Sequence, residues 1–273
     1  MIKLFSASSI SSHLECPRKF YHRYIERLPS EPNIHLIRGN ILHSTVEKFF
    51  DNCNASMSLK DFQFMINNLF LACWNQKRSE LASLNLPDLN YYFEESQLMA
   101  SNWVNHFNEE LEREMENGHS RDEAIKRLTP KTEVHIVSDE LRLQGYLDAI
   151  HEKDGTIEIL DYKTSKKDDI QDYLFQLGIY GLLYLSKFKR LPDKASIFFF
   201  KHGQRSIQMT KELIEKSKHE LTVLKEKLSQ TTEKKDYNQK VSGLCKYSTG
   251  QCDFYNLCFK NDIEFQEARN NSY

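Results

Sequence analysis

A carboxylate and a lysine close one apolar stretch of the chain. The segment TIEILDYKTSK, residues 156–166, reads as a strand that ends in Asp161, Tyr162 and Lys163. Side chains two positions apart on a strand point to the same face, so Asp161 and Lys163 share a face. A strand that emerges into solvent also ends in charges, and for this D-x-K segment alone that alternative stays open.

A second carboxylate is expected to face the first across a hairpin. The segment LRLQGYLDAI, residues 141–150, alternates in polarity as a strand does. The Asp-Gly pair at residues 154–155 predicts a two-residue turn between the two strands. Counting outward from that turn, Asp148 falls opposite Asp161, with Cβ atoms about 4.5–5.5 Å apart.

This pairing predicts a metal site. Two opposed carboxylates repel each other unless a cation lies between them, and Mg²⁺ or Mn²⁺ prefers oxygen ligands. Lys163, on the same face, can then polarise a phosphate oxygen or hold an attacking water. The alternative is an Asp–Lys–Asp charge cluster on an exposed face of a sheet.

The composition sets broad limits. The chain has 273 residues, which suits one large domain or two small ones, with 40% hydrophobic and 28% charged residues. A net charge of −2 gives no global basic signal, although a local groove with a metal can still bind nucleic acid. There is no apolar run of membrane-spanning length and no signal-peptide pattern at the start. We therefore expect a cytoplasmic protein without a membrane partner.

Strands interleaved with helices predict an α/β (α+β) fold. The segment RGNILHSTVEKFF, residues 38–50, is expected to form a helix that starts at its glycine and carries His43, which by itself could equally be an ordinary boundary histidine. Residues 58–128 are helical in pattern. The expected strands are 131–137, 141–150, 156–163, 195–201 and 205–210, and the later helices are 169–187 and 211–229.

Four cysteines at the two ends of the chain suggest a metal or cluster site. Cys245, Cys252 and Cys258 crowd together near the C-terminus, and Cys16 lies near the N-terminus. In a cytosolic protein such thiols bind metal more readily than they form disulfides. A 4Fe–4S cluster or a structural zinc would join the two ends of the chain, whereas ordinary free cysteines remain the alternative.

Taken together, these motifs resemble the PD-(D/E)XK nuclease superfamily, in particular its RecB-like branch with an iron–sulfur cluster. GNILH, GYLDAI and ILDYKT match three of its motifs in order. The resemblance implies a restriction-endonuclease-like core, a metal bound by His43, Asp148, Asp161 and the Tyr162 carbonyl, and Lys163 as the catalytic lysine.

The fourth motif, QLGIY, matches the Q-x-x-x-Y helix of this family. It implies that Gln176 and Tyr180 line the catalytic site. The resemblance also implies a single nuclease domain over 1–273, with a helical insertion at 51–130 and an iron–sulfur subdomain formed by 1–28 plus 241–260. Its cofactor ligands would be Cys16, Cys245, Cys252 and Cys258, although the six residues between the first two of the C-terminal triplet depart from the usual C-x2-C.

The function implied is that of an Mg²⁺- or Mn²⁺-dependent DNA nuclease. The resemblance implies an exonuclease on single-stranded DNA ends, in DNA repair, recombination or CRISPR adaptation, with helicase or CRISPR adaptation proteins as partners. A catalytically silent DNA-binding or scaffolding module of a helicase–nuclease complex is the alternative from another class. An enzyme outside nucleic-acid chemistry is a third.

Overall fold

The computed structural model of the chain describes residues 4–231, 233–247 and 250–259. These residues fall into two compact units. The larger unit comprises Pro32–Val137 and Gly145–Ser217, and the smaller comprises Met1–Glu31, Ser138–Gln144 and Lys218–Tyr273. Every predicted catalytic and metal-binding residue of the D-x-K region belongs to the larger unit, and all four terminal cysteines belong to the smaller one.

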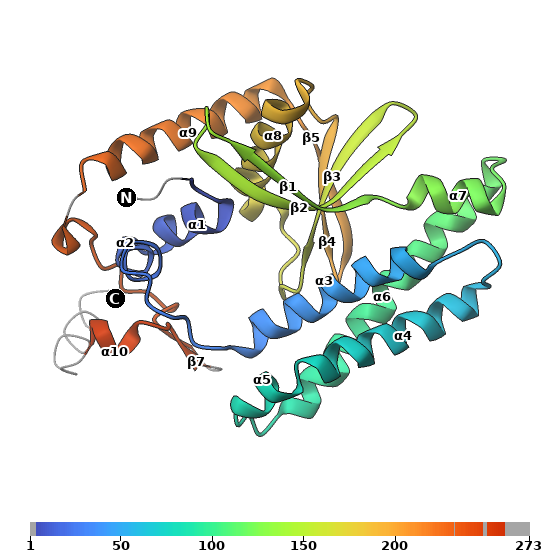
Figure 1. The fold of residues 1–273 in the computed structure, drawn as a ribbon, viewed down its shortest axis with the longest axis horizontal. Helices are drawn as coiled ribbons and strands as arrows, with labels where there is room; N and C mark the ends of the chain where they lie inside the picture. The colour runs from blue at the N-terminus through green and yellow to red at the C-terminus, as the bar shows by residue number, and fades with distance from the viewer. Residues whose placement is uncertain (1–3, 232, 248–249, 260–273) are drawn as a thin grey trace. The chain divides into compact units, whose positions relative to one another are not determined.

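One mixed sheet organises the larger unit (Figure 1). Within the described residues it has five strands in the order β1-β2-β3-β4-β5. Strands β2 and β3 are antiparallel, β3 and β4 are parallel, and β4 and β5 are antiparallel. The predicted α/β class is thereby confirmed as a mixed sheet with flanking helices. The strands are β1 (Lys131–Ser138), β2 (Leu143–Lys153), β3 (Thr156–Lys163), β4 (Lys194–Phe199) and β5 (Gly203–Gln208).

The hairpin between β2 and β3 has the predicted register. Asp154 and Gly155 both have positive φ, 51° and 74°, as a two-residue turn of this kind requires. Lys153 pairs with Thr156, and the ladder continues outward to Ala149 and Leu160. Asp148 and Asp161 are therefore the next residues beyond the last ladder pair.

Helices of the larger unit cover both faces of the sheet. Helix α8 joins β3 to the parallel strand β4, because a parallel pair needs a crossover. Helices α3, α4 and α6 lie side by side (Figure 1). The helices are α3 (Ile34–Asn52), α4 (Leu59–Gln76), α5 (Arg78–Ser83), α6 (Leu89–Glu116), α7 (Arg121–Leu128), η2 (Ile170–Tyr173), α8 (Leu174–Phe188) and α9 (Lys211–Ser229), the last of which runs on into the smaller unit.

The helical segment that follows α3 builds much of the apolar core. Buried residues of α3, α4 and α6, such as Phe49, Phe62 and Trp103, belong to one cluster with Leu160 and Phe198 of the sheet. The first three side chains come from the helices and the last two from the strands, so the cluster fills the interface between the helices and the sheet. The helices at 58–128, in which the sequence showed no chemistry, thus cover one face of the sheet.

One detail of α3 differs from the expectation. The helix begins at Ile34, after the capping side chain of Asn33, so Gly39 lies inside it and not at its start. A Cβ on Gly39 would meet nothing within 4 Å. The Asn33 side chain accepts a hydrogen bond from the Leu36 N–H, which stabilises the earlier start.

The smaller unit joins the two ends of the described chain. Arg18 donates from Nε to the Tyr237 carbonyl at 2.8 Å. Arg23 forms an ion pair with Asp253. The smaller unit contains α1 (Ala7–Glu15), α2 (Pro17–Phe20), η1 (Tyr21–Ile25), η3 (Lys234–Asp236), β6 (Lys246–Tyr247), β7 (Gly250–Gln251) and α10 (Tyr255–Cys258). None of the helices in the described ranges is long and apolar enough to cross a membrane.

Candidate metal and catalytic site

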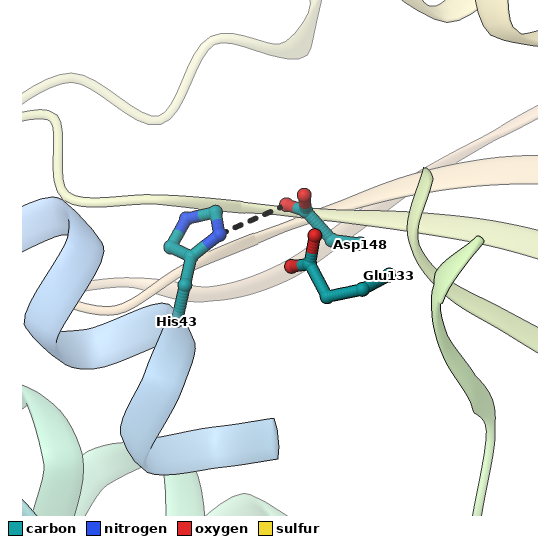
Figure 2. A group of neighbouring side chains, drawn as sticks. All are labelled: His43, Glu133 and Asp148. Atoms are coloured by element: carbon teal, nitrogen blue, oxygen red, sulfur yellow. Dashed lines mark ion pairs between the residues drawn. The ribbon is translucent and has the colours of Figure 1, made fainter. Parts of the chain in front are cut away.

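Three side chains from separate elements converge beside the β2–β3 hairpin. His43 comes from α3, Glu133 from β1 and Asp148 from β2 (Figure 2). One ligand atom of each lies within 4.8 Å of the others. Among the described residues this is the only group of three or more histidines, cysteines and acids that meets this spacing. Imidazole and carboxylate donors together suit Mn²⁺, and the carboxylates suit Mg²⁺.

Both nitrogens of His43 face predicted ligands. Its Nδ1 lies 3.4 Å from Oδ2 of Asp148. Its Nε2 lies 3.1 Å from the backbone carbonyl oxygen of Tyr162, to which it can donate in one tautomer. The imidazole is half-buried and projects from α3 toward the strands (Figure 2). His43 therefore contacts two of the predicted metal ligands, Asp148 and the Tyr162 carbonyl.

Asp148 is tied to the backbone of the neighbouring strand. Its Oδ2 accepts a hydrogen bond from the Tyr162 N–H at 2.9 Å. Burial raises the pKa of the Asp148 carboxyl to about 6, repulsion from Asp161 adds to that shift, and His43 opposes it. A buried carboxyl that is costly to ionise is well suited to a cation, whose charge would favour the ionised form.

Asp161 is surrounded by polar partners on the same face of the sheet. It is 2% exposed. It forms an ion pair with Lys163. Its Oδ1 accepts hydrogen bonds from Nε2 of Gln176 at 3.0 Å and from the hydroxyl of Tyr180 at 3.3 Å. These contacts bring together four of the residues that the sequence marked, although Asp161 itself lies outside the 4.8 Å group.

Lys163 is held as an ammonium. Burial lowers its pKa, but the carboxylate of Asp161 and its hydrogen bond raise that pKa by more, and the net shift is upward. The Nζ atom also lies 5.6 Å from the centroid of the Tyr173 ring, in cation–π geometry. At neutral pH Lys163 therefore carries a positive charge, which suits stabilisation of a phosphate better than proton abstraction.

Close packing of α8 positions Gln176 and Tyr180. A Cβ added at Gly178, between these two residues, would lie 1.9 Å from Oγ of Ser217 on α9. Gln176 also donates from Nε2 to the Tyr180 hydroxyl at 2.8 Å. The spacing of four residues places the two side chains on one face of the helix, as the sequence indicated.

Glu133 is the member of the group that the sequence did not reveal. It lies on β1 with φ of 48°, a left-handed conformation that is uncommon for a non-glycine residue and recurs at functional sites. Burial raises the pKa of its carboxyl, and His43 opposes this shift. In the sequence Glu133 is one acid in a strand of mixed charge, and only the neighbouring position of β1 and β2 in the sheet brings it near Asp148.

The four terminal cysteines line one pocket of the smaller unit. Lysine 240 donates from its backbone N–H to Sγ of Cys16 at 3.5 Å. Burial raises the pKa of Cys258 to about 11, and the other three cysteines add to that shift, Cys16 first. In the described part of the chain, however, no three of these sulfurs come within 4.8 Å of one another.

The unusual spacing of the triplet has a structural explanation. After Cys245, two short antiparallel strands pair Lys246 with Gln251 and Tyr247 with Gly250. Beside them the Cys252 N–H donates to the Cys245 carbonyl at 3.0 Å. The backbones of the two cysteines therefore lie next to each other despite the longer spacing.

Comparisons with known proteins gave one family match and a similar solved structure. The sequence profile of the PD-(D/E)XK nuclease superfamily matches residues 4–259. A crystal structure of a suggested exonuclease from Eubacterium rectale is similar, with a TM-score of 0.50, 14% identity, and coverage of 95% of this chain and 88% of that one. At this identity the likeness concerns the fold alone. No curated protein gives a significant match.

Proposed function

Since the chain belongs to the PD-(D/E)XK nuclease superfamily, we propose that it is an Mg²⁺- or Mn²⁺-dependent DNA nuclease that hydrolyses phosphodiester bonds. The observation that carries the proposal is the convergence of His43, Glu133 and Asp148 beside the buried Asp161–Lys163 pair. A metal site next to a fixed ammonium is what phosphoryl hydrolysis needs, because both stabilise charge on the phosphate.

The roles follow from the contacts of each residue. His43, Asp148, Asp161 and the Tyr162 carbonyl would hold the metal, and Glu133 is added to this set by its position. The bound metal would lower the pKa of a water and offset phosphate charge. Lys163, as an ammonium, orients that water and contacts a non-bridging phosphate oxygen.

Gln176 and Tyr180 are assigned to the substrate side of Asp161. Both donate to Asp161 Oδ1, so they fix the direction of the carboxylate. With its direction fixed in this way, the Asp161 carboxylate would be available as a metal ligand, and Gln176 and Tyr180 could also donate to an oxygen of the DNA strand.

More specifically, the protein is proposed to be an exonuclease of the RecB-like branch. It would act on single-stranded DNA ends in DNA repair, recombination or CRISPR adaptation. The motif order supports the branch, and the likeness to a suggested exonuclease is consistent with the activity. A helicase or CRISPR adaptation protein is then the expected partner. The domain organisation proposed is one nuclease domain over 1–273 with the helical insertion at 51–130.

A 4Fe–4S cluster bound by Cys16, Cys245, Cys252 and Cys258 completes the proposal, in a subdomain of residues 1–28 plus 241–260. Its support is the shared pocket and the mutual effect of the thiols on the pKa of Cys258. In such a cluster each thiolate would bind a different iron. A structural zinc on the same four thiolates is the alternative.

The deciding experiment is cleavage of end-labelled single-stranded and double-stranded DNA with Mg²⁺ or Mn²⁺, and with chelator. We expect metal-dependent release of short products from single-stranded ends. Circular single-stranded DNA separates exonuclease from endonuclease action, since only an endonuclease cuts it. Binding without cleavage in every metal would favour the silent scaffolding module, and neither binding nor cleavage would favour chemistry outside nucleic acids.

A further inference from the structure

A cavity of about 570 Å³ lies on the face of the sheet opposite to Asp161 and Lys163. On β3 its lining includes Glu158, Leu160 and Tyr162, which alternate with the residues that face the catalytic site, Asp161 and Lys163. The volume falls within the range of about 300–1,000 Å³ that is usual for small-molecule sites. The proposed hydrolysis uses no side chain of this cavity.

Aromatic side chains form its wall. Trp103 and Phe107 of α6 are stacked, with ring centroids 5.9 Å apart and an interplanar angle of 14°. Phe198 of β4 and Phe50 of α3 line the cavity beside them. A wall of flat rings favours a planar ligand, because a base can stack on an aromatic ring.

Polar groups that face the wall come from the sheet. The carboxylate of Glu158 accepts a hydrogen bond from Nε2 of Gln204 at 2.8 Å and forms an ion pair with Lys194 at 3.0 Å. His151 pairs with Glu158 across the β2–β3 ladder. Burial lowers the pKa of His151, so its imidazole is neutral and offers one donor and one acceptor. Glu158, Gln204 and His151 together can therefore accept hydrogen bonds from a ligand and donate hydrogen bonds to it.

The basic side chains of the lining are already balanced by acids. Arg127 and Lys153 both pair with Glu114, which is 1% exposed. Arg113 forms an ion pair with Glu110, and Lys194 forms one with Glu158. The cavity therefore has little free positive charge for a phosphate, and recognition rests on ring stacking and on hydrogen bonds at the ligand edge.

We propose that this cavity binds a single nucleobase, presented by a free deoxynucleotide or by a base of a DNA strand. The base stacks on Trp103 and Phe107, and its polar edge contacts Glu158 and Gln204. Amino-bearing bases fit better than thymine, because the carboxylate accepts from an exocyclic amine. The choice of a nucleobase among planar polar ligands rests on the proposed nuclease function.

Calorimetric titration of the full chain in chelator tests the proposal without cleavage. The probes are dGMP, dAMP, dCMP, TMP, deoxyribose 5-phosphate and a short single-stranded oligonucleotide. We expect saturable binding of an amino-bearing nucleotide, weaker binding of TMP and none of the sugar phosphate. Glu158→Gln and Gln204→Ala should each weaken binding by about tenfold or more. Gln208→Ala, on the same strand but outside the lining, should have no effect.

An active-site variant locates the ligand. Asp161→Asn should retain nucleotide binding, because its side chain points to the other face of the sheet. Oligonucleotide affinity that falls in Glu158→Gln identifies a strand base as the source, whereas nucleotide affinity that falls in this variant with the oligonucleotide affinity unchanged identifies a free nucleotide. Absence of binding at millimolar nucleotide, or binding that is lost in Asp161→Asn and kept in the folded Gln204→Ala variant, overturns the proposal while leaving the cleavage result untouched.

Discussion

The backbone of Tyr162 connects Asp148 to His43. The Tyr162 N–H donates to Oδ2 of Asp148 at 2.9 Å, and the Tyr162 carbonyl lies 3.1 Å from Nε2 of His43. Asp148 lies one residue beyond the last ladder pair, Ala149–Leu160, and its side chain accepts the hydrogen bond from the Tyr162 N–H. A side chain thus replaces the expected backbone acceptor, and this arrangement fixes the carboxylate beside the histidine.

Asp148→Asn should stabilise the metal-free protein at pH 8. The folded-state pKa of Asp148 is raised from 3.8 to about 6, so the ionised carboxylate destabilises the fold above that pH. The variant should gain about 1–3 kcal/mol in the free energy of unfolding at pH 8, and the gain should vanish as the pH falls from 6 to 4. Urea denaturation in chelator measures the gain at pH 8 and its loss at lower pH. A gain that does not depend on pH would contradict the raised pKa of Asp148.

Asp148→Ala is the matched control for that substitution. Asparagine keeps an oxygen that can accept from the Tyr162 N–H, whereas alanine leaves this buried donor without its partner. We expect the alanine variant to be about 1–3 kcal/mol less stable than the asparagine variant. Both variants should lose metal-dependent cleavage.

Lys163→Met should lower the rate of cleavage by about 10²- to 10⁴-fold, because it removes the ammonium beside the phosphate and keeps much of the side-chain volume. The Mn²⁺ concentration for half-maximal activity should stay the same, since Lys163 is no metal ligand. Lys60→Met, an exposed change on α4, serves as the control. Near-native cleavage by Lys163→Met would refute the assigned role.

His43→Ala and Glu133→Gln should weaken metal binding. Because a metal that binds only the folded state raises Tm, the wild type should melt at a higher temperature in Mn²⁺ than in chelator. This difference should shrink in both variants, and the Mn²⁺ midpoint for activity should rise by about tenfold or more. His219→Ala on α9 is the control. An unchanged midpoint with a lower Tm would leave His43 a structural residue.

Gly178→Ala should destabilise the larger unit and reduce cleavage. The new Cβ would lie 1.9 Å from Oγ and 2.7 Å from Cβ of Ser217, so α8 must shift and carry Gln176 and Tyr180 with it. The expected loss is about 1–3 kcal/mol, and Ser217→Gly should restore part of it. Gly39→Ala, in open space on α3, should instead stabilise the protein by about 0.5–1 kcal/mol. Equal effects of the two substitutions would show that α8 is not tightly constrained.

Cys16→Ser, Cys252→Ser and Cys258→Ser should abolish the iron content and the broad absorbance at about 400 nm of anaerobically purified protein. Cys245→Ser should do the same, because the paired strands Lys246–Tyr247 and Gly250–Gln251 keep the backbone of Cys245 beside that of Cys252. Cys73→Ala, in the helical core, should leave the iron in place. One equivalent of zinc without iron would refute the cluster and leave the nuclease assignment standing.

The sequence by itself determined the features that depend on local interactions. The Asp-Gly turn and the alternation of the strands on either side of it set the β2–β3 register, so Asp148 and Asp161 could be placed next to each other before the structure was known. The helical spacing of Gln176 and Tyr180 is likewise local. Gly39 was misplaced at the start of α3, since the capping residue Asn33 lies further upstream.

Only the tertiary structure decided which distant groups share a site. Glu133 joins His43 and Asp148 because β1 takes the edge position beside β2, and no periodicity in one segment specifies that neighbour. The cavity that faces Glu158 likewise exists only because α6 packs across the sheet. Such contacts join residues far apart in the chain, and they form when burial of apolar surface selects one packing of the elements.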